Sequence, residues 1–501
     1  MKRVLVANRG EIAVRIIRAC HEEGLEAIAV YSEADRLSPH VRAADAAVGI
    51  GPAAAAESYL HIERLLDAAR RTGADAVHPG YGFLAERDEF AEAVERARLV
   101  FVGPPPAAIR AMGEKTAARQ RMAAAKVPFV PGTTEPVRDA AAAVAAAKTL
   151  GYPVMLKAVA GGGGRGMRQA GSADELSTLF RQASSEAKSA FGDGSLYLEK
   201  LIERPRHVEI QILADGHGRT VHLGERECSV QRRHQKLIEE SPSPAVTPDL
   251  RRRMGQAAVR AAQAVGYLSA GTVEFLLAPS GEFYFLEMNT RIQVEHPVTE
   301  MVYGVDLVRE QLRIAAGHPM SLPDEVPEPR GHAIECRITS EDPFQGFVPA
   351  TGRIEFLRPP AGPGVRWESG IEMGTDVGLF YDPLLAKLIA WGDDREGAIR
   401  RMERALDELV IVGVQTSQPF HRRVLGEPEF RSGRYDIGYL ERVGPRLLGP
   451  ATDDAELELA AVAVALAEEE ARQVPASPGP APADAHRPGN WLRAARLEGL
   501  R

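Results

Sequence analysis

The sequence contains few lysines for its length and basic content. Of its 61 basic residues only nine are lysine, so the other 52 are arginine. Alanine is frequent as well, for example in the runs Ala53–Ala56 and Ala140–Ala143. An ammonium is a compact point charge, whereas a guanidinium is a broad planar fork. In a chain that otherwise uses arginine, the lysines are therefore candidates for positions that arginine cannot fill.

Other scarcities exclude several classes of protein. The three cysteines, Cys20, Cys228 and Cys336, form no C-x-x-C pair, which argues against a disulfide framework or a zinc site. The apolar run Val4–Ala7 is too short for a signal peptide, and the longest later run, Leu459–Ala467, is too short to span a membrane. A formal charge of −8 argues against non-specific nucleic-acid binding. We therefore expect a soluble, cytoplasmic protein.

The first hundred residues alternate between strand and helix patterns. A length of 501 residues allows about three domains. A helical pattern is predicted from Ile12 to Cys20 and another over Ile62–Ala69. The strands predicted around them are Val4–Ala7, Ala27–Tyr31, Ala76–His78 and Leu99–Val102. This alternation predicts an α/β domain with a mostly parallel sheet.

Later segments follow other patterns. Residues 131–203 read as a small α/β insert, and from His207 onward alternating strands predict an antiparallel sheet with helices on one side. These strands are Val208–Leu213, Val221–Leu223, Thr272–Leu277 and Phe283–Met288. Beyond about residue 444, a helix is predicted over Glu456–Arg472, followed by a Pro/Ala-rich linker.

A glycine run suggests a phosphate-binding loop. Gly161–Gly164 follow a predicted strand that carries Lys157. Consecutive glycines expose backbone N–H groups and allow a phosphate chain to approach closely. The run lies after residue 150 rather than in the first strand-to-helix turn, which argues against a Rossmann dinucleotide site, and no G-K-[ST] follows. A flexible loop that covers phosphates fits better than a plain surface loop.

A second pattern predicts a β-hairpin with facing carboxylates. Two apolar stretches flank the turn-forming residues 279–281. If the last two of these form the turn, Glu274 lies directly opposite Glu287, and Asn289 lies on the same face. Two carboxylates that close together repel unless a cation lies between them, and oxygen ligands suit Mg²⁺ or Mn²⁺. Two exposed strand carboxylates are the alternative.

The segment after this hairpin carries a candidate base. Arg291, Gln293 and Glu295 alternate onto one face. Together they offer a planar cation for a small oxyanion, an amide, and a carboxylate that can accept a proton. A further basic run, Gln231–Lys236, is either a solvated surface or part of the same site.

Five of these segments together resemble the biotin carboxylases, the ATP-grasp enzymes of the biotin-dependent carboxylases. The segments are Lys2–Cys20, His78–Leu84, the glycine loop, Glu225–Lys236 and Glu287–Pro297. The resemblance extends from the first residue to about Val443. It implies α/β and α+β domains in an ATP-grasp fold, with a Rossmann-like N-terminal domain, a mobile lid and a C-terminal antiparallel-sheet domain. The implied boundaries are 1–112, 113–330 with a lid at about 131–203, 331–443, and a tail at 444–501.

The resemblance also implies a nucleotide site. The ATP-binding residues would be Lys115, Lys157, Gly163, Gly164, Glu199, Lys200, Ile202, His207, Gln231, His234, Glu274 and Glu287. The metal ligands would be Glu274, Glu287 and Asn289, which agrees with the hairpin argument. Two ions, Mg²⁺ or Mn²⁺, would accompany ATP.

The same resemblance implies the rest of the machinery. Bicarbonate would contact Lys236, Arg291, Gln293, the Val294 backbone and Glu295. Glu295 would be the base that leads to carboxyphosphate, and Arg337 would stabilise the biotin enolate. A homodimer would use Arg18, Glu22 and Arg366. Lys387 lies in another segment that resembles the family, with no role implied.

Biotin is expected to come from another chain. No Ala-Met-Lys-Met motif is present, and no lysine follows Lys387. We therefore expect a subunit of an acetyl-CoA or acyl-CoA carboxylase that works with a biotin carboxyl carrier protein and a carboxyltransferase. A pyruvate carboxylase subunit is the alternative. Two rival functions are another ATP-grasp ligase, and a non-catalytic assembly subunit.

Overall fold

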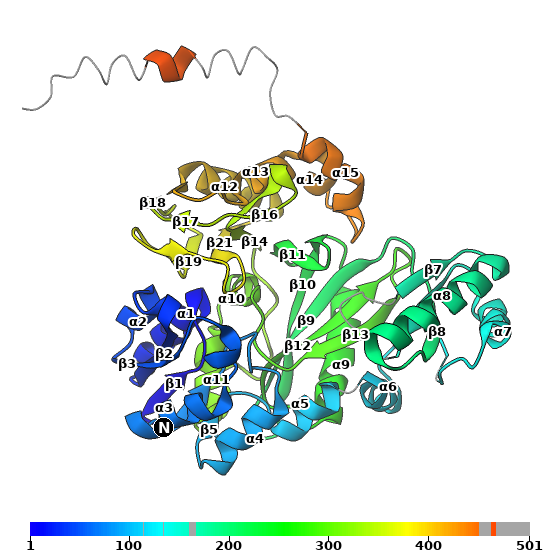
Figure 1. Cartoon of the computed structure of the whole chain (residues 1–501), viewed down its shortest axis with the longest axis horizontal. Helices are drawn as coiled ribbons and strands as arrows, with labels where there is room; N and C mark the ends of the chain where they lie inside the picture. Colours follow the sequence, from blue (N-terminus) through cyan, green and yellow to red (C-terminus); the bar gives the residue numbers. More distant parts are fainter. Residues whose placement is uncertain (114, 134, 160–166, 450–461, 467–501) are drawn as a thin grey trace, which may run out of the picture. The chain divides into compact units, whose positions relative to one another are not determined.

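A computed structural model describes residues 1–113, 115–133, 135–159, 167–449 and 462–466 (Figure 1). The chain divides into two compact units, Met1–Leu447 and Leu448–Arg501. Within the second unit, residues 462–466 are helical. The rest of the helix predicted over Glu456–Arg472 lies outside the described residues.

A five-stranded parallel sheet, in the order β3-β2-β1-β4-β5, begins the first unit. Its strands are β1 (Arg3–Val6), β2 (Glu26–Ser32), β3 (Ala46–Gly51), β4 (Ala76–His78) and β5 (Val100–Phe101). Its helices are α1 (Gly10–Glu22), α2 (Pro39–Ala43), α3 (Ile62–Thr72), α4 (Asp88–Arg96) and α5 (Pro106–Gly113). The predicted βαβ alternation is confirmed, and β3 is an additional strand. Val4, Val6, Ile12 and Ile16 are buried between α1 and the sheet, because apolar residues recur at helical spacing along α1.

The segment predicted as a small insert has its own sheet and core. Three antiparallel strands, in the order β7-β6-β8, carry two helices. The elements are α7 (Ala140–Leu150), β6 (Val154–Ala158), β7 (Met167–Ala170), α8 (Ala173–Phe191) and β8 (Leu196–Lys200). Leu156, Leu176 and Leu198 are fully buried in this core. Helix α6 (Lys115–Ala124) precedes the segment.

An eight-stranded antiparallel sheet forms the centre of the first unit, in the order β13-β12-β9-β10-β11-β14-β21-β19. Its strands are β9 (Arg206–Ala214), β10 (Thr220–Arg232), β11 (Gln235–Ser241), β12 (Ser269–Leu277), β13 (Phe283–Asn289), β14 (His332–Thr339), β19 (Val365–Ser369) and β21 (Leu384–Gly392). The antiparallel sheet predicted from the alternation is confirmed. It continues through the β11–β14 pairing, so one sheet joins the central segment to the later strands.

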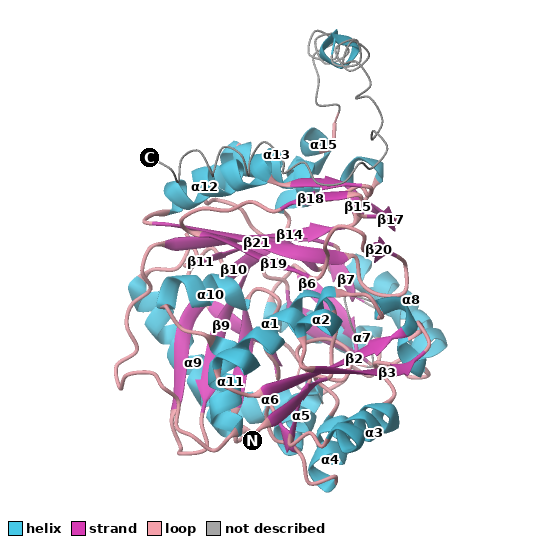
Figure 2. Cartoon of the chain, turned by 90° about the vertical axis from the view of Figure 1, so that its left-hand side faces the viewer, coloured by secondary structure: helices cyan, strands magenta, loops and turns pink. Residues whose placement is uncertain are grey.

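Helices pack around this sheet. The main ones are α9 (Pro248–Ala264), α10 (His296–Tyr303), α11 (Leu307–Ala315), α12 (Arg395–Glu408), α13 (Gln418–Gly426), α14 (Pro428–Arg431) and α15 (Tyr439–Leu447). Helix α9 packs on β9 and β10, while α10 contacts β10, β11, β14 and β21. Figure 2 shows α12 and α13 beside β14 and β21. No helix among the described residues is long and apolar enough to cross a membrane.

Short two-stranded sheets complete the C-terminal part of the first unit. They pair β15 (Glu341–Asp342) with β16 (Val348–Pro349), β17 (Gly352–Arg353) with β20 (Asp376–Val377), and β18 (Phe356–Arg358) with β22 (Val410–Val412).

The predicted pairing of Glu274 with Glu287 in the β12–β13 hairpin is confirmed. Near the turn, however, Leu277 pairs with Phe283, so the loop is one residue longer than the assumed two-residue turn. Leu286 is then an extra residue on β13, which shifts the register back by one. The longer loop and the bulge compensate, and the two carboxylates still face each other.

Gly370 allows the start of α1 to approach the strand that ends at Ser369. A Cβ atom at this position would lie 2.7 Å from the Glu11 nitrogen and 2.9 Å from the Gly10 carbonyl carbon. These are backbone atoms, which cannot turn aside as a flexible side chain can. We expect Gly370→Ala to lower the free energy of unfolding by about 1–3 kcal/mol, measured by urea denaturation.

Gly216→Ala is the matched control, because a Cβ there would meet nothing within 4 Å. A Gly370→Ala variant as stable as the Gly216→Ala variant would contradict the close approach between Gly370 and α1.

Candidate active site

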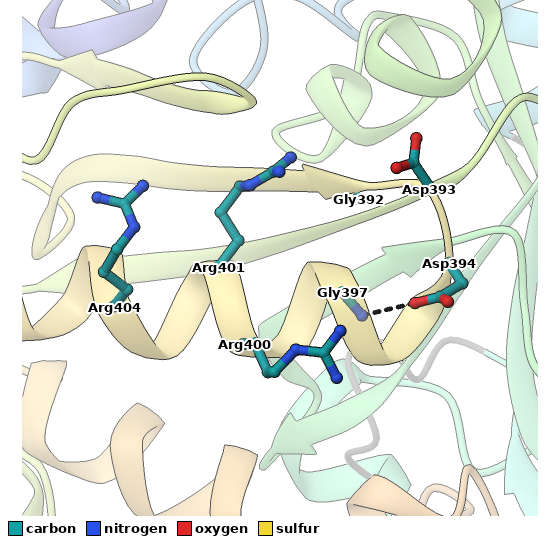
Figure 3. A pocket seen from close by; sticks show the side chains of 7 residues that line it. All are labelled: Gly392, Asp393, Asp394, Gly397, Arg400, Arg401 and Arg404. Carbon is teal, nitrogen blue, oxygen red and sulfur yellow. Dashed lines mark hydrogen bonds between the residues drawn. The ribbon is translucent and has the colours of Figure 1, made fainter.

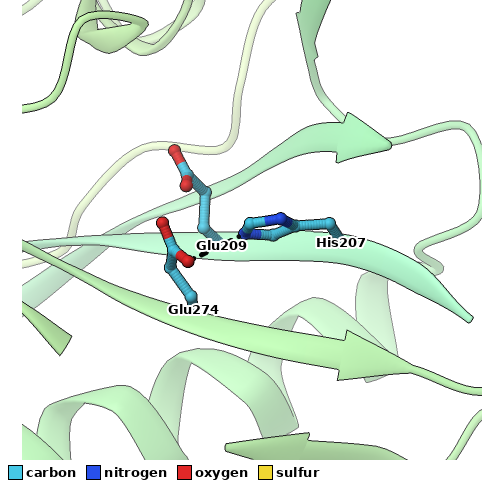
Figure 4. Close-up of side chains that lie close together, drawn as sticks. All are labelled: His207, Glu209 and Glu274. Atoms are coloured by element: carbon cyan, nitrogen blue, oxygen red, sulfur yellow. Dashed lines mark ion pairs between the residues drawn. The ribbon is translucent and has the colours of Figure 1, made fainter. Parts of the chain in front are cut away.

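Three buried glutamates surround the amino group of Lys236 on β11. The Lys236 nitrogen lies 2.6 Å from Glu209, 3.1 Å from Glu274 and 2.5 Å from Glu295. Glu209 and Glu274 extend from neighbouring strands, beside His207 (Figure 4). Burying carboxylates is costly unless a cation pairs with them. Lys236 therefore holds together side chains from β9, β11, β12 and the loop before α10.

Glu295, the predicted base, lies between two cations. Its second carboxylate oxygen lies 2.9 Å from the Arg337 guanidinium. Burial alone would raise the pKa of Glu295, but Lys236 and Arg337 outweigh burial and lower the pKa well below its ordinary value. Glu295 is therefore ionised at neutral pH and able to accept a proton.

Side chains from several segments contact the Glu274 carboxylate. Asn289 donates to it at 2.8 Å and Gln293 at 3.1 Å, and the His207 Nε2 lies 3.0 Å from its other oxygen. Burial would raise its pKa, but Lys236 and His207 lower it. Glu287 lies opposite on β13 and is exposed. The two carboxylates paired across the strands, together with the Asn289 amide oxygen, are ligands of the kind that suits Mg²⁺.

Arg291 orients the loop that links this hairpin to α10. Its guanidinium lies 2.9 Å from Glu86, and donates to Gln293 at 3.0 Å and Asn289 at 3.1 Å. The structure thus brings together the Arg291, Gln293 and Glu295 side chains that the sequence placed on one face. Glu86, from the loop after β4, is an additional contact.

Arg337 on β14 connects Glu295, the predicted base, to a second carboxylate. Its guanidinium pairs with Glu239 on β11 at 2.5 Å as well as with Glu295. Burial and the charge of Glu295 raise the pKa of Glu239 to about 7, although Arg337 opposes the shift. Arg337 is mostly buried, with 17% of its side chain exposed.

The three-stranded segment carries three predicted nucleotide contacts. Lys157 on β6 forms an ion pair with Glu199 on β8. Lys200 donates to the Gly151 and Tyr152 carbonyls, each at 3.0 Å.

Other predicted nucleotide contacts are placed only in part. Ile202 follows β8 and is half-buried. Lys115 begins α6, and Gly163 and Gly164 lie outside the described residues.

The Gln231–Lys236 run forms a tight hairpin turn. Gln231 pairs with Lys236 across β10 and β11, and only Arg233 and His234 lie in the turn. Both have positive φ angles, 49° and 66°, in a two-residue turn of the kind that glycine and asparagine normally occupy. Non-glycine residues in this region carry backbone strain, which is common at functional sites. This turn places Gln231 beside Lys236 and exposes His234.

Glu209 and Arg226 are two further site residues that the sequence did not predict. Glu209 binds Lys236, and the fully buried Arg226 binds Glu209 at 2.6 Å. Arg226 also donates to Gln211, Thr299 and Thr272. Period-two alternation along β9 places His207 and Glu209 on one face, so this pattern could have revealed Glu209 once His207 was suspected.

A separate surface hollow of about 380 Å³ lies at the start of α12 (Figure 3). It is lined by Gly392, Asp393, Asp394, Gly397, Arg400, Arg401 and Arg404. Asp394 caps α12, and Arg401 donates to the Trp391 carbonyl. The lining contains no predicted site residue, and these contacts are structural.

Family models match three successive segments. They are the biotin carboxylase N-terminal domain over residues 1–109, the ATP-binding domain of the carbamoyl-phosphate synthase L chain over 114–322, and the biotin carboxylase C-terminal domain over 335–442.

Several known proteins are similar over most of the chain. The biotin carboxylase of Nostoc sp. is 54% identical over 88% of this chain and 99% of that protein. The chain belongs to the biotin carboxylase family. A pyruvate carboxylase subunit of Methanothermobacter thermautotrophicus is 51% identical over 88% of this chain and 89% of that protein.

Solved structures agree with this assignment. One is the biotin carboxylase domain dimer of Hydrogenobacter thermophilus 2-oxoglutarate carboxylase, in complex with MgADP, ADP and bicarbonate. It shares 47% identity and a TM-score of 0.83, over 90% of this chain and 99% of that chain. The chain is therefore an ATP-dependent carboxylase with the ATP-grasp fold.

The three residues predicted at a dimer interface differ in their surroundings. Arg18 and Glu22 are exposed on α1. Arg366 on β19 pairs with Glu300 at 2.7 Å and with Glu368 within the same chain.

His421 supports the strand that carries Arg337. Its Nε2 lies 2.6 Å from the Arg337 carbonyl oxygen, and burial lowers its pKa to about 4. In the unfolded chain the pKa is about 6.5, so between pH 6.5 and 4 the unfolded state binds a proton that the folded state does not. This contribution to stability is complete above pH 6.5 and falls as the pH drops, by about 2 kcal/mol at pH 5.0.

We therefore compare the free energies of unfolding of the native protein and His421→Gln, measured by urea denaturation. We expect the difference between them to narrow by about 2 kcal/mol from pH 7.5 to pH 5.0. His61→Gln, at an exposed position, is the control and should show a constant gap. A His421→Gln gap that does not change with pH would contradict a neutral buried imidazole.

Proposed function

We propose that this chain is the biotin carboxylase subunit of an acetyl-CoA or acyl-CoA carboxylase, and that it carboxylates biotin carried on a separate carrier protein. The observation that carries this proposal is the position of Glu295. It is a buried, ionised carboxylate between Lys236 and Arg337, on the loop that carries Arg291 and Gln293. The cations suit an anionic substrate, and the carboxylate suits its deprotonation.

In the proposed reaction, bicarbonate binds Lys236, Arg291, Gln293 and the Val294 backbone. The anion competes with Glu295 for these cations, so the affinity of Glu295 for a proton rises. Glu295 then removes the bicarbonate proton, and the bicarbonate oxygen attacks the γ-phosphate of ATP. The products are ADP and carboxyphosphate, and the charge that develops is stabilised by the surrounding lysines.

The proposed ATP site spans the lid and the central sheet. The residues are Lys115, Lys157, Gly163, Gly164, Glu199, Lys200, Ile202, His207, Gln231, His234, Glu274 and Glu287. Mg²⁺, or Mn²⁺, would be held by Glu274, Glu287 and Asn289, where it would neutralise phosphate charge. Opening the Lys157–Glu199 ion pair would release Lys157 for a phosphate. Closure of the 131–203 lid would exclude water from carboxyphosphate.

The second half of the proposed reaction takes place at Arg337. Carboxyphosphate breaks down to CO₂ and phosphate, and the phosphate removes the ureido N–H proton of biotin. Arg337 stabilises the resulting enolate, and biotin N1 attacks CO₂. The partial exposure of the Arg337 side chain, beside Glu295, supports the role.

We infer the partners from this chemistry. They are a biotin carboxyl carrier protein and a carboxyltransferase. A second copy of the chain would bind at Arg18, Glu22 and Arg366. We place this assembly in the cytoplasm. A pyruvate carboxylase subunit is the second candidate, because such a subunit is among the similar proteins.

We propose domains at residues 1–112, 113–330 and 331–443, with a tail at 444–501.

Glu295→Gln should lower biotin carboxylation about 100-fold or more, since it removes the base while keeping the shape of the side chain. ATP binding should be unchanged. The measurement is ADP release with bicarbonate and free biotin, together with nucleotide binding by calorimetry.

Glu282→Gln is the control. This residue is exposed in the loop of the β12–β13 hairpin, and the variant should keep normal turnover. Near-normal turnover in Glu295→Gln would point to another base. ATP cleavage by the native protein that is indifferent to biotin and bicarbonate would contradict the proposed function itself.

A further inference from the structure

Lys387, for which the sequence implied no role, is fully buried on β21. Its amino group donates to the Val294 carbonyl oxygen at 2.9 Å and lies 3.1 Å from Glu11 and 2.9 Å from Glu368. An ammonium has three N–H donors. Lys387 therefore hydrogen-bonds the loop before α10 and forms ion pairs with carboxylates from α1 and β19.

The Val294 carbonyl belongs to the loop that carries the proposed base. It lies in the same planar peptide as the Glu295 nitrogen. Glu295 is the N-cap residue, immediately before the first residue of α10, with φ and ψ angles of −81° and 11°. A hydrogen bond to the Val294 carbonyl thus fixes the peptide plane next to the Glu295 side chain.

The two carboxylates that form ion pairs with Lys387 also have another partner. Glu11 accepts a hydrogen bond from the Tyr81 hydroxyl, and Glu368 pairs with Arg366. Burial alone would lower the pKa of Lys387, but Glu11 and Glu368 outweigh burial and raise it. The amino group therefore stays charged while it donates to the Val294 carbonyl.

Lys387 is also in register with the catalytic strand. It lies directly opposite Arg337 in the β14–β21 pairing. A shift of β21 would therefore be transmitted to the Val294 peptide and to the strand that holds Arg337.

We propose that Lys387 is a positioning residue that holds the Val294–Glu295 peptide in the orientation needed to bind bicarbonate. This inference rests on the proposed function. Lys387 touches no substrate in this arrangement and acts through the loop. Its predicted signature is a defect in bicarbonate use that leaves ATP use intact.

Lys387→Met removes the donor to Val294 and leaves two carboxylates without their shared cation. We expect the KM for bicarbonate to rise about tenfold or more and kcat to fall, because a buried acceptor loses its partner. The KM for ATP should stay within about twofold of the native value. Lys148→Met, at an exposed position on α7, is the control and should change neither constant.

Lys387→Met also unbalances buried charge, which could unfold the protein. The double variant Lys387→Met/Glu11→Gln keeps the net charge of the cluster and preserves an acceptor for Tyr81. We expect it to regain thermal stability and to retain the bicarbonate defect. Recovery of the native bicarbonate KM in the double variant would show that Lys387 only balances charge, and would overturn the inference.

The two proposals fail in different ways. Native protein that cleaves ATP without needing bicarbonate or biotin contradicts the proposed function. Native protein with normal bicarbonate dependence, combined with a native bicarbonate KM in Lys387→Met, contradicts only the role of Lys387.

Discussion

The neutralisation of buried carboxylates is the constraint on which the first unit depends. Glu209, Glu274 and Glu295 meet at Lys236, and each would be costly to bury without that cation. Because these glutamates come from different strands and a loop, pairing their charges also fixes the positions of those segments. The network that holds the fold together is thus the one that prepares the site for an anionic substrate.

Much of the site could be predicted because its signals are local. The β12–β13 hairpin follows from alternating apolar residues around a short turn, and the pairing of Glu274 with Glu287 was correct. It was correct although the turn was longer than assumed, because the bulge at Leu286 offset the difference. Bulges have little local signal, so a register argument of this kind predicts which side chains face each other better than it predicts the path between them.

The rest of the site lacks a local sequence signal. Arg233 and His234 form a tight turn that contains neither glycine nor asparagine, so the residues that usually indicate such a turn are absent. The pairing of β11 with β14 joins segments separated by a long stretch of other elements, and only the folded chain shows that they share one sheet. Lys387 forms an ion pair with Glu11, which is separated from it in sequence by most of the first unit, so no local pattern could predict this contact.

These contacts give a physical reason for the use of lysine at particular positions in a chain where lysine is scarce. Arg226 and Arg337 present planar forks to acceptors arranged side by side, as guanidinium geometry requires. Lys236 and Lys387 instead lie among acceptors that converge on one point, which suits a compact ammonium. Both lysines act on Glu295: Lys236 at its carboxylate, and Lys387 at the carbonyl just before it. The proposed base is held on both sides, so its position depends on the two cations that arginine is least able to replace.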